Sequence, residues 1–214
     1  MSEATNARET ILNRIRSANT TANATMHAAE YEAIERNYQH TSTLDRETIL
    51  KTFLDHLHEY DANVVEAKPE TLAATIAEVL KSNNQKSVIL ADTFPEENLP
   101  TGFIWQRESQ ATKDQLNTAA GAISACEVAI AHTGTIILRG ARKLTLLPDR
   151  FLCIVHEDQI VDTVPEAIAR LEEYKTETLT FVSGPSATAD IEMTRIRGVH
   201  GPRFLDVIVV RNHG

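Results

Sequence analysis

The chain has 214 residues, enough for one substantial hydrophobic core with a small extension, and too few for two full-sized domains to be expected. Its composition, 42% hydrophobic and 24% charged residues, is that of a globular protein and argues against wholesale disorder. The formal net charge of −9 repels a phosphate backbone and argues against general nucleic-acid binding.

The beginning of the chain has acidic residues near its methionine and lacks the apolar core of a signal peptide. No window of sequence approaches the roughly 18 consecutive apolar residues of a membrane-spanning helix. We therefore expect a soluble, cytoplasmic protein.

The two cysteines, Cys126 and Cys153, lie in apolar sequence and do not form a C-x-x-C pair. An iron–sulfur cluster or an all-cysteine zinc site needs a larger set of cysteine ligands, so this chain is expected to hold neither by itself. We predict buried structural thiols and no metal site.

The N-terminal segment is predicted to be a helical arm. Residues 8–16 place Ile11, Leu12 and Ile15 on one helical face, and residues 17–25 have the small polar composition of a linker. We predict an arm and linker over residues 1–42 and one main domain over residues 43–214.

The main domain begins with a predicted helix that Thr43 or Asp45 caps, followed by a short strand over residues 62–67. A second helix opens at Pro69, and residues 87–92 form an apolar, β-rich run that is typical of a buried parallel strand. This order is a βαβ unit.

The same alternation continues to residue 211, with an irregular connection over residues 93–103. It predicts an α/β fold with a largely parallel sheet flanked by helices, and an N-terminal helical arm. Further helices are predicted at 112–122, 165–174 and 188–198, and further strands at 124–131, 135–140, 151–157, 178–184 and 204–211.

The first candidate site is the turn after the strand at 178–184, with Ser183, Gly184, Ser186 and Thr188. If a helix begins there, its free backbone N–H groups and its dipole favour a bound phosphate or carboxylate. A plain capped turn is the alternative. The spacing matches neither a G-x-G-x-x-G fingerprint nor a P-loop.

The second candidate site is the turn His132, Thr133, Gly134 and Thr135, which gathers an imidazole, two hydroxyls and backbone amides. These groups can cradle a small carboxylate or phosphate. The alternative is an ordinary β-hairpin whose threonines serve β propensity.

Near the C-terminus, His200 stands between two glycines in "GVHGP". It is a better candidate for a functional role than the neighbouring arginines Arg195 and Arg197. Arg195 and Arg197 are two positions apart on the predicted helix, so they cannot both face one pocket. Gly198 fits the C-cap of that helix.

Two other groups of charged residues indicate a binding site less specifically than the two turns do. The stretch from Arg139 to Arg150 is the densest basic segment, which indicates either local attraction for an anion or a solvated face. His56 and His58 point in different directions on their predicted helix, so we expect surface residues rather than metal ligands.

Three segments carry a family resemblance. "AIAHTGTIIL", "LTLLPDRFLCIVHEDQIV" and "VSGPSATADIEMTRIRGVHGPRFLDVIVV" closely resemble the LUD-domain family, in particular its lactate utilization protein C (LutC) branch. The resemblance covers most of residues 110–211, and "ARETILNRIR" is similar to the opening helix of that family. It therefore makes the main domain a LUD-type domain.

The resemblance implies a fold like that of the NagB/RpiA/CoA-transferase group and a subunit of a system that oxidises L-lactate to pyruvate. It implies an iron–sulfur subunit and a cysteine-rich subunit as partners, with the iron–sulfur clusters on those partners and no cofactor on this chain. Where the family commonly has Glu, this chain has His132, so a carboxylate role at that turn does not carry over.

Two alternatives remain open, because a fold alone does not select a chemistry. One is an autonomous enzyme that acts on a small anionic substrate, such as a sugar phosphate, a CoA ester or a folate-like molecule. The other is a scaffold without catalytic activity.

Overall fold

The computed structural model describes residues 2–19, 28–188, 196–198 and 200–212, and the chain divides into two compact units, residues 1–39 and 40–214. The first unit contains α1 (Ser2–Ala18), which extends beyond the predicted helix at 8–16 and includes two residues of the expected linker. Residues 20–25 of that linker lie outside the described residues. No helix in the described part of the chain is long and apolar enough to cross a membrane.

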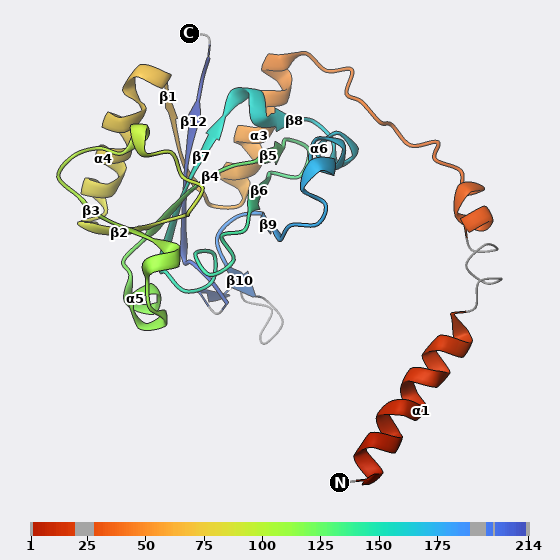
Figure 1. Cartoon of the computed structure of the whole chain (residues 1–214). Helices are drawn as coiled ribbons and strands as arrows, with labels where there is room; N and C mark the ends of the chain where they lie inside the picture. Colours follow the sequence, from red (N-terminus) through yellow and green to blue (C-terminus); the bar gives the residue numbers. More distant parts are fainter. Residues whose placement is uncertain (1, 20–27, 189–195, 199, 213–214) are drawn as a thin grey trace. The chain divides into compact units, whose positions relative to one another are not determined.

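The second unit is built on a six-stranded sheet in which every pair of neighbouring strands is parallel (Figure 1). This confirms the predicted α/β class. The strands lie in the order β1 (Asn63–Ala67), β12 (Phe204–Val210), β7 (Arg150–His156), β4 (Ala122–Ala125), β2 (Ser87–Leu90) and β3 (Ile104–Arg107). The edge strand β3 was missed from the sequence, where its mixed "IWQR" pattern lacks a continuous apolar run.

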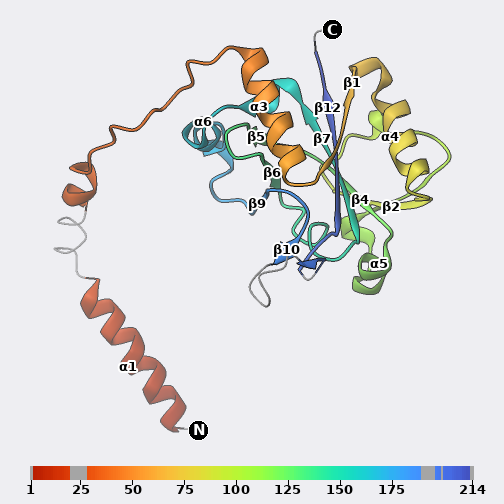
Figure 2. The same cartoon turned by 180° about the vertical axis from the view of Figure 1, so that it is seen from behind.

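Helices cover both faces of this sheet. Figures 1 and 2 show α3 (Arg46–Glu59) and α4 (Leu72–Ser82) on opposite sides of β12. Helix α3 begins where predicted, because the Asp45 carboxylate accepts the N–H of Thr48 at 3.0 Å. Its apolar stripe is buried, and Phe53 and Leu57 are fully covered. The second unit also contains the short helices α5 (Lys113–Thr118) and α6 (Val164–Arg170).

A smaller four-stranded sheet forms beside the large one, in the order β8 (Ile160–Val161), β5 (Val128–Ile130), β6 (Thr135–Arg139) and β9 (Leu179–Val182). The β5–β6 pair is the predicted hairpin across residues 132–134. The single strand predicted at 124–131 is wrong, because the chain leaves the large sheet after Ala125 and enters the small sheet at Val128. A continuous apolar run cannot reveal such a transfer, since both strands are buried.

The helix predicted at 188–198 is also wrong in its described parts. Ala187–Thr188 and Ile196–Arg197 form the antiparallel strands β10 and β11, while residues 189–195, including Arg195, lie outside the described residues. The Gly198 N–H donates to Ser186 O at 2.9 Å, and the Ser186 N–H donates to Pro202 O at 2.9 Å. These long-range bonds close a hairpin, so Ser186 does not begin a helix and Gly198 does not end one.

On one side of the large sheet, ion pairs of Arg211 connect the carboxyl ends of the strands. Arg211, directly after β12, donates to Glu66 of β1 at 2.8 Å and to Glu47 of α3 at 3.0 Å, and its Nε lies 3.4 Å from Glu157 after β7. These acids raise the pKa of the Arg211 guanidinium, chiefly through the hydrogen bond to Glu66. The ends of β2 and β3 lie outside this network.

Candidate functional site

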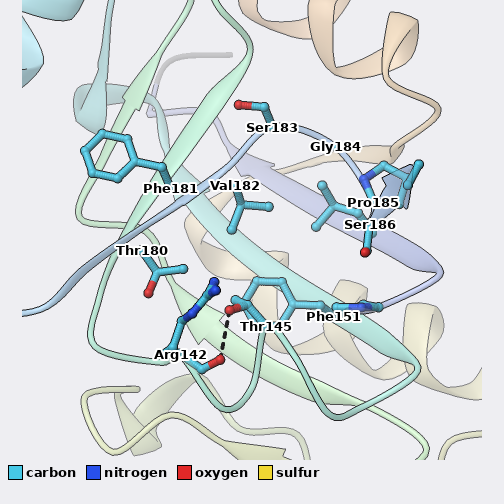
Figure 3. A pocket seen from close by; sticks show the side chains of 13 residues that line it. Arg142, Thr145, Phe151, Thr180, Phe181, Val182, Ser183, Gly184, Pro185 and Ser186 are labelled. Carbon is cyan, nitrogen blue, oxygen red and sulfur yellow. Dashed lines mark hydrogen bonds between the residues drawn. The ribbon is translucent and has the colours of Figure 1, made fainter. Parts of the chain in front are cut away.

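A pocket of about 260 Å³ lies at the amino ends of β7 and β12, and we call it the Ser183 pocket (Figure 3). Its wall is the segment 180–187, which runs from the end of β9 into β10, and its opposite side includes Arg142 and Thr145. Phe151, Leu205 and Pro202 complete the lining. In Figure 3, Val182 and Ser186 lie across the pocket from Thr145 and Arg142.

The two turns that the sequence singled out meet behind this pocket. The hydroxyl of Thr135 lies 2.8 Å from the hydroxyl of Ser183 and 2.7 Å from that of Thr133, so three side-chain hydroxyls form one continuous chain. Thr135 is buried and Ser183 lines the pocket. The hydroxyl chain therefore fixes the Ser183 side chain, which belongs to the pocket, against the hairpin turn.

Both turns also rest on the end of α3. Gly134 and Gly184 have φ of +58° and +83°, a left-handed conformation that favours glycine. A Cβ on Gly184 would lie 2.7 Å from the Cβ of Tyr60, and a Cβ on Gly134 would lie 2.8 Å from the Cβ of His56. Only glycine allows the turns to approach α3 this closely.

Arg142 is held by a strained turn. Gly140 and Ala141 both have positive φ, +68° and +54°, and this conformation is costly for alanine. The Gly140 N–H donates to Thr178 O at 2.7 Å, and the Thr180 hydroxyl donates to Gly140 O at 2.8 Å. These two bonds to the segment 178–180 thus fix the backbone just before Arg142.

The floor of the pocket is anchored by a buried ion pair. Asp206, which is only 1% exposed, accepts two bonds from one terminal nitrogen of Arg150, at 2.9 and 2.8 Å, and a third from Asn63 at 2.9 Å. Each partner of this pair is adjacent in sequence to a lining residue, Phe151 or Leu205. The pair therefore fixes the amino ends of β7 and β12 together.

The other candidate residues lie outside this pocket. His132 and His200 are exposed, and neither is among the described residues that line it. Thr188 is in β10 rather than in a helical first turn. The anion cradle was predicted from helical N–H groups at residues 186–189. Residues 186–188 are not helical, and residue 189 lies outside the described residues.

His56 departs from its expected surface position. Its side chain is half-buried, and its Nδ1 lies 2.7 Å from the carbonyl oxygen of Ala131, the residue before the hairpin turn. His58 is exposed as expected. The helical period of α3 did place the two rings on different faces, but it could not show that one face meets the hairpin.

Sequence reasoning also missed Tyr60, Thr145 and Thr180, which contact the turns or line the pocket. They lie on three separate segments and match no motif. The basic composition of residues 139–150 was the one signal that pointed toward Arg142.

The two cysteines are buried, as predicted. Burial in apolar surroundings raises the pKa of both thiols, because it disfavours the thiolate. A thiol in that state is a poor nucleophile and a poor metal ligand. The pocket chemistry accordingly comes from the guanidinium and the hydroxyls.

The Ser183 pocket can accept a small anion. Arg142 is the one charged residue in its described lining, and a guanidinium binds a carboxylate with two parallel hydrogen bonds. Drug-sized ligands usually occupy about 300–1,000 Å³, so this pocket fits a smaller molecule.

Comparison with known proteins places this site in a family. The chain is 38% identical over 199 residues to "Lactate utilization protein C" of Deinococcus radiodurans, covering 89% of this chain and 92% of that protein. A protein of the same name from Shouchella clausii is 29% identical, over 76% of this chain and 78% of its own.

A solved structure matches as well. The crystal structure of a DUF162 family protein from Deinococcus radiodurans has a TM-score of 0.67 and 36% identity, covering 78% of this chain and 99% of that chain. The LUD domain profile matches residues 1–210. This chain belongs to the LUD domain family.

Proposed function

We propose that this chain is a subunit of an L-lactate utilization system and acts with iron–sulfur partner proteins. The observation that carries this proposal is the 38% identity to a protein named "Lactate utilization protein C", along 92% of that protein. That alignment also covers 89% of this chain.

The Ser183 pocket would bind the carboxylate of lactate or pyruvate. The Arg142 guanidinium would hold the two carboxylate oxygens, and the Ser186 hydroxyl on the opposite wall can bond the second oxygen function of either molecule. Val182 and Phe151 offer apolar contact for a methyl group. The small volume favours such a ligand over a larger one.

Electron transfer would take place on the partners. The sequence holds two cysteines, and both are buried among apolar residues. An iron–sulfur cluster usually requires about four cysteine ligands. The proposed division of labour therefore assigns the clusters to the partner proteins and the carboxylate-binding site to this chain.

A genetic experiment tests the proposed function. Deletion of the gene in its host should abolish growth on L-lactate and leave growth on pyruvate unchanged, and the wild-type gene should restore it. Arg142→Ala should fail to restore growth, whereas Arg170→Ala should restore it, because Arg170 is an exposed arginine outside the pocket. Normal growth of the deletion strain on L-lactate would contradict the proposal.

A biochemical experiment tests the partnership. A tagged chain purified from cells grown on L-lactate should carry bound proteins whose absorption spectrum shows iron–sulfur clusters. Recovery of the chain alone, under conditions where those proteins are present in the lysate, would refute the association. A thermal-shift response to CoA esters but not to pyruvate or lactate would favour an autonomous enzyme instead.

A further inference from the structure

A second pocket, of about 770 Å³, lies next to the Ser183 pocket and shares Arg142 with it. We call it the Glu108 pocket. Its lining includes residues that directly follow β2, β3 and β6, among them Asp92, Glu108 and Lys143. Five of its lining residues, Arg139 to Lys143, belong to the basic segment 139–150, and the proposed function uses Arg142 alone among them.

The topology of the large sheet favours ligand binding at this place. Strands β2 and β4 are neighbours, but the strand that follows β2, β3, lies on one side of this pair, and the next strand of this sheet after β4, β7, lies on the other. In open α/β sheets, ligands bind beyond the carboxyl ends of the strands at such a switch point. Ala91 and Asp92, the first residues after β2, line the Glu108 pocket. The carboxyl ends of β1, β12 and β7 are closed by the ion pairs of Arg211.

One side of the Glu108 pocket is acidic. One carboxylate oxygen of Asp92 accepts the N–H of Ser109 at 3.1 Å and its hydroxyl at 2.8 Å, which fixes Asp92 beside Glu108. Burial and repulsion from Asp92 raise the pKa of Glu108, while Lys143 acts in the opposite direction. Two carboxyl groups in such an arrangement are acceptors for the hydroxyls of a ligand, as at the ribose sites of dinucleotide-binding folds.

The other side is basic. Arg139 has internal partners, because its Nε lies 3.6 Å from Glu127 and 3.9 Å from Glu177. Within the described part of the chain, Arg142 and Lys143 have no ion-pair partner. Lys143 interacts electrostatically with Glu108 without a salt bridge to it. Two consecutive cations beside a pocket in a protein of net charge −9 favour a doubly charged anion such as a phosphate.

From this arrangement we infer that the Glu108 pocket binds a phosphorylated molecule with vicinal hydroxyls, a nucleotide or a sugar phosphate. The phosphate contacts Lys143 and Arg142, and the hydroxyls donate to Asp92 and Glu108. The volume suits a ligand much larger than lactate. This inference does not rest on the proposed function, since it concerns a different pocket and a different ligand.

Isothermal titration of the full chain with four probes tests the inference. Ribose 5-phosphate and AMP should bind, and the tighter of the two identifies the source of the phosphate. 2-Deoxyribose 5-phosphate, which lacks one hydroxyl, should bind about tenfold more weakly than ribose 5-phosphate, and inorganic phosphate more weakly still. Equal binding of ribose 5-phosphate and inorganic phosphate would overturn the assignment of the hydroxyls, and no binding of any probe would overturn the site.

Variants locate the binding. Lys143→Ala should weaken the binding of ribose 5-phosphate and of AMP about tenfold or more. Asp92→Asn should reduce the preference for ribose 5-phosphate over 2-deoxyribose 5-phosphate. Lys51→Ala, an exposed lysine on α3, is the matched control and should bind all probes like the wild type. Both Asp92 and Lys143 are exposed, so these variants are expected to fold. Unchanged binding in Lys143→Ala would place the ligand elsewhere and refute the inference.

Discussion

The two pockets meet at Arg142 but are built in different ways. The Ser183 pocket is formed by glycine turns, a chain of hydroxyls and a buried ion pair, and its one described charge is Arg142. The Glu108 pocket carries exposed or half-exposed charges of both signs. Core substitutions should therefore disturb the Ser183 pocket through its shape, whereas charge substitutions should alter the Glu108 pocket with little effect on stability.

The largest expected effect is at the floor of the Ser183 pocket. Asp206→Ala leaves the Arg150 guanidinium largely buried without its partner, so we expect a loss of about 3–5 kcal/mol in the free energy of unfolding, measured with urea. The control is Asp149→Ala, which removes an exposed ion pair with Arg203 and should change stability little. Equal stability of the Asp206 variant and the wild type would show that this pair does not anchor the strands.

The turn at Gly184 gives the next largest effect. Gly184→Ala introduces a Cβ against Tyr60 at positive φ, so we expect a loss of about 1–3 kcal/mol and weaker binding in the Ser183 pocket. Gly102→Ala is the matched control, because Gly102 has φ of +89° but no atom within 4 Å of the added Cβ. If both variants lost the same stability, backbone strain rather than contact with Tyr60 would explain the result.

Competition for Arg142 should couple the pockets. Saturating pyruvate should weaken the binding of ribose 5-phosphate several-fold. Saturating ribose 5-phosphate should weaken the binding of pyruvate by the same factor, because coupling between two binding equilibria is reciprocal. In Arg142→Lys the coupling should decrease, since lysine lacks the planar fork of arginine. Titrations of each ligand in the presence of the other measure this. Independent binding would mean that Arg142 serves one pocket alone.

The smallest expected effect is the pH dependence at Glu108. Its raised pKa means that the folded chain binds this proton more tightly than the unfolded chain does. The stabilisation is complete below the pKa of the unfolded state and is lost as the pH rises through the folded pKa. Glu108→Gln cannot ionise, so its Tm should rise relative to the wild type between about pH 4 and pH 7. Glu97→Gln is the exposed control, and a fall in the relative Tm of the Glu108 variant would contradict the sign.

The sequence predicted those parts of the fold that local patterns determine. The stripe of α3 follows from helical periodicity and β12 from its apolar run. Asp45 caps α3, and Pro69 opens the 3-10 turn Pro69–Thr71 that leads into α4. The helix predicted at 188–198 is wrong in its described parts, because the backbone of Ser186 bonds to Pro202 and Gly198, which are distant in sequence. No local propensity shows these partners.

The candidate site was predicted in part for the same reason. The hydroxyls and backbone amides of the two turns marked them as candidate anion sites, and the structure brings Thr135 and Ser183 together. The surface on which the turns rest, Tyr60, lies at the end of a helix whose sequence carries no signal of its role. Asp92 and Glu108 become neighbours only because β2 and β3 are adjacent and parallel.

Titration of pyruvate and L-lactate into the wild-type chain, Arg142→Ala and the control Arg170→Ala tests the proposed carboxylate site in the Ser183 pocket directly. Loss of the charge-assisted bonds should cost about 1.5–3 kcal/mol, so the Arg142 variant should bind at least about tenfold more weakly, while the control should bind like the wild type. Equal affinity of Arg142→Ala and the wild type, or no binding of either acid to the wild type, would contradict a carboxylate site in the Ser183 pocket.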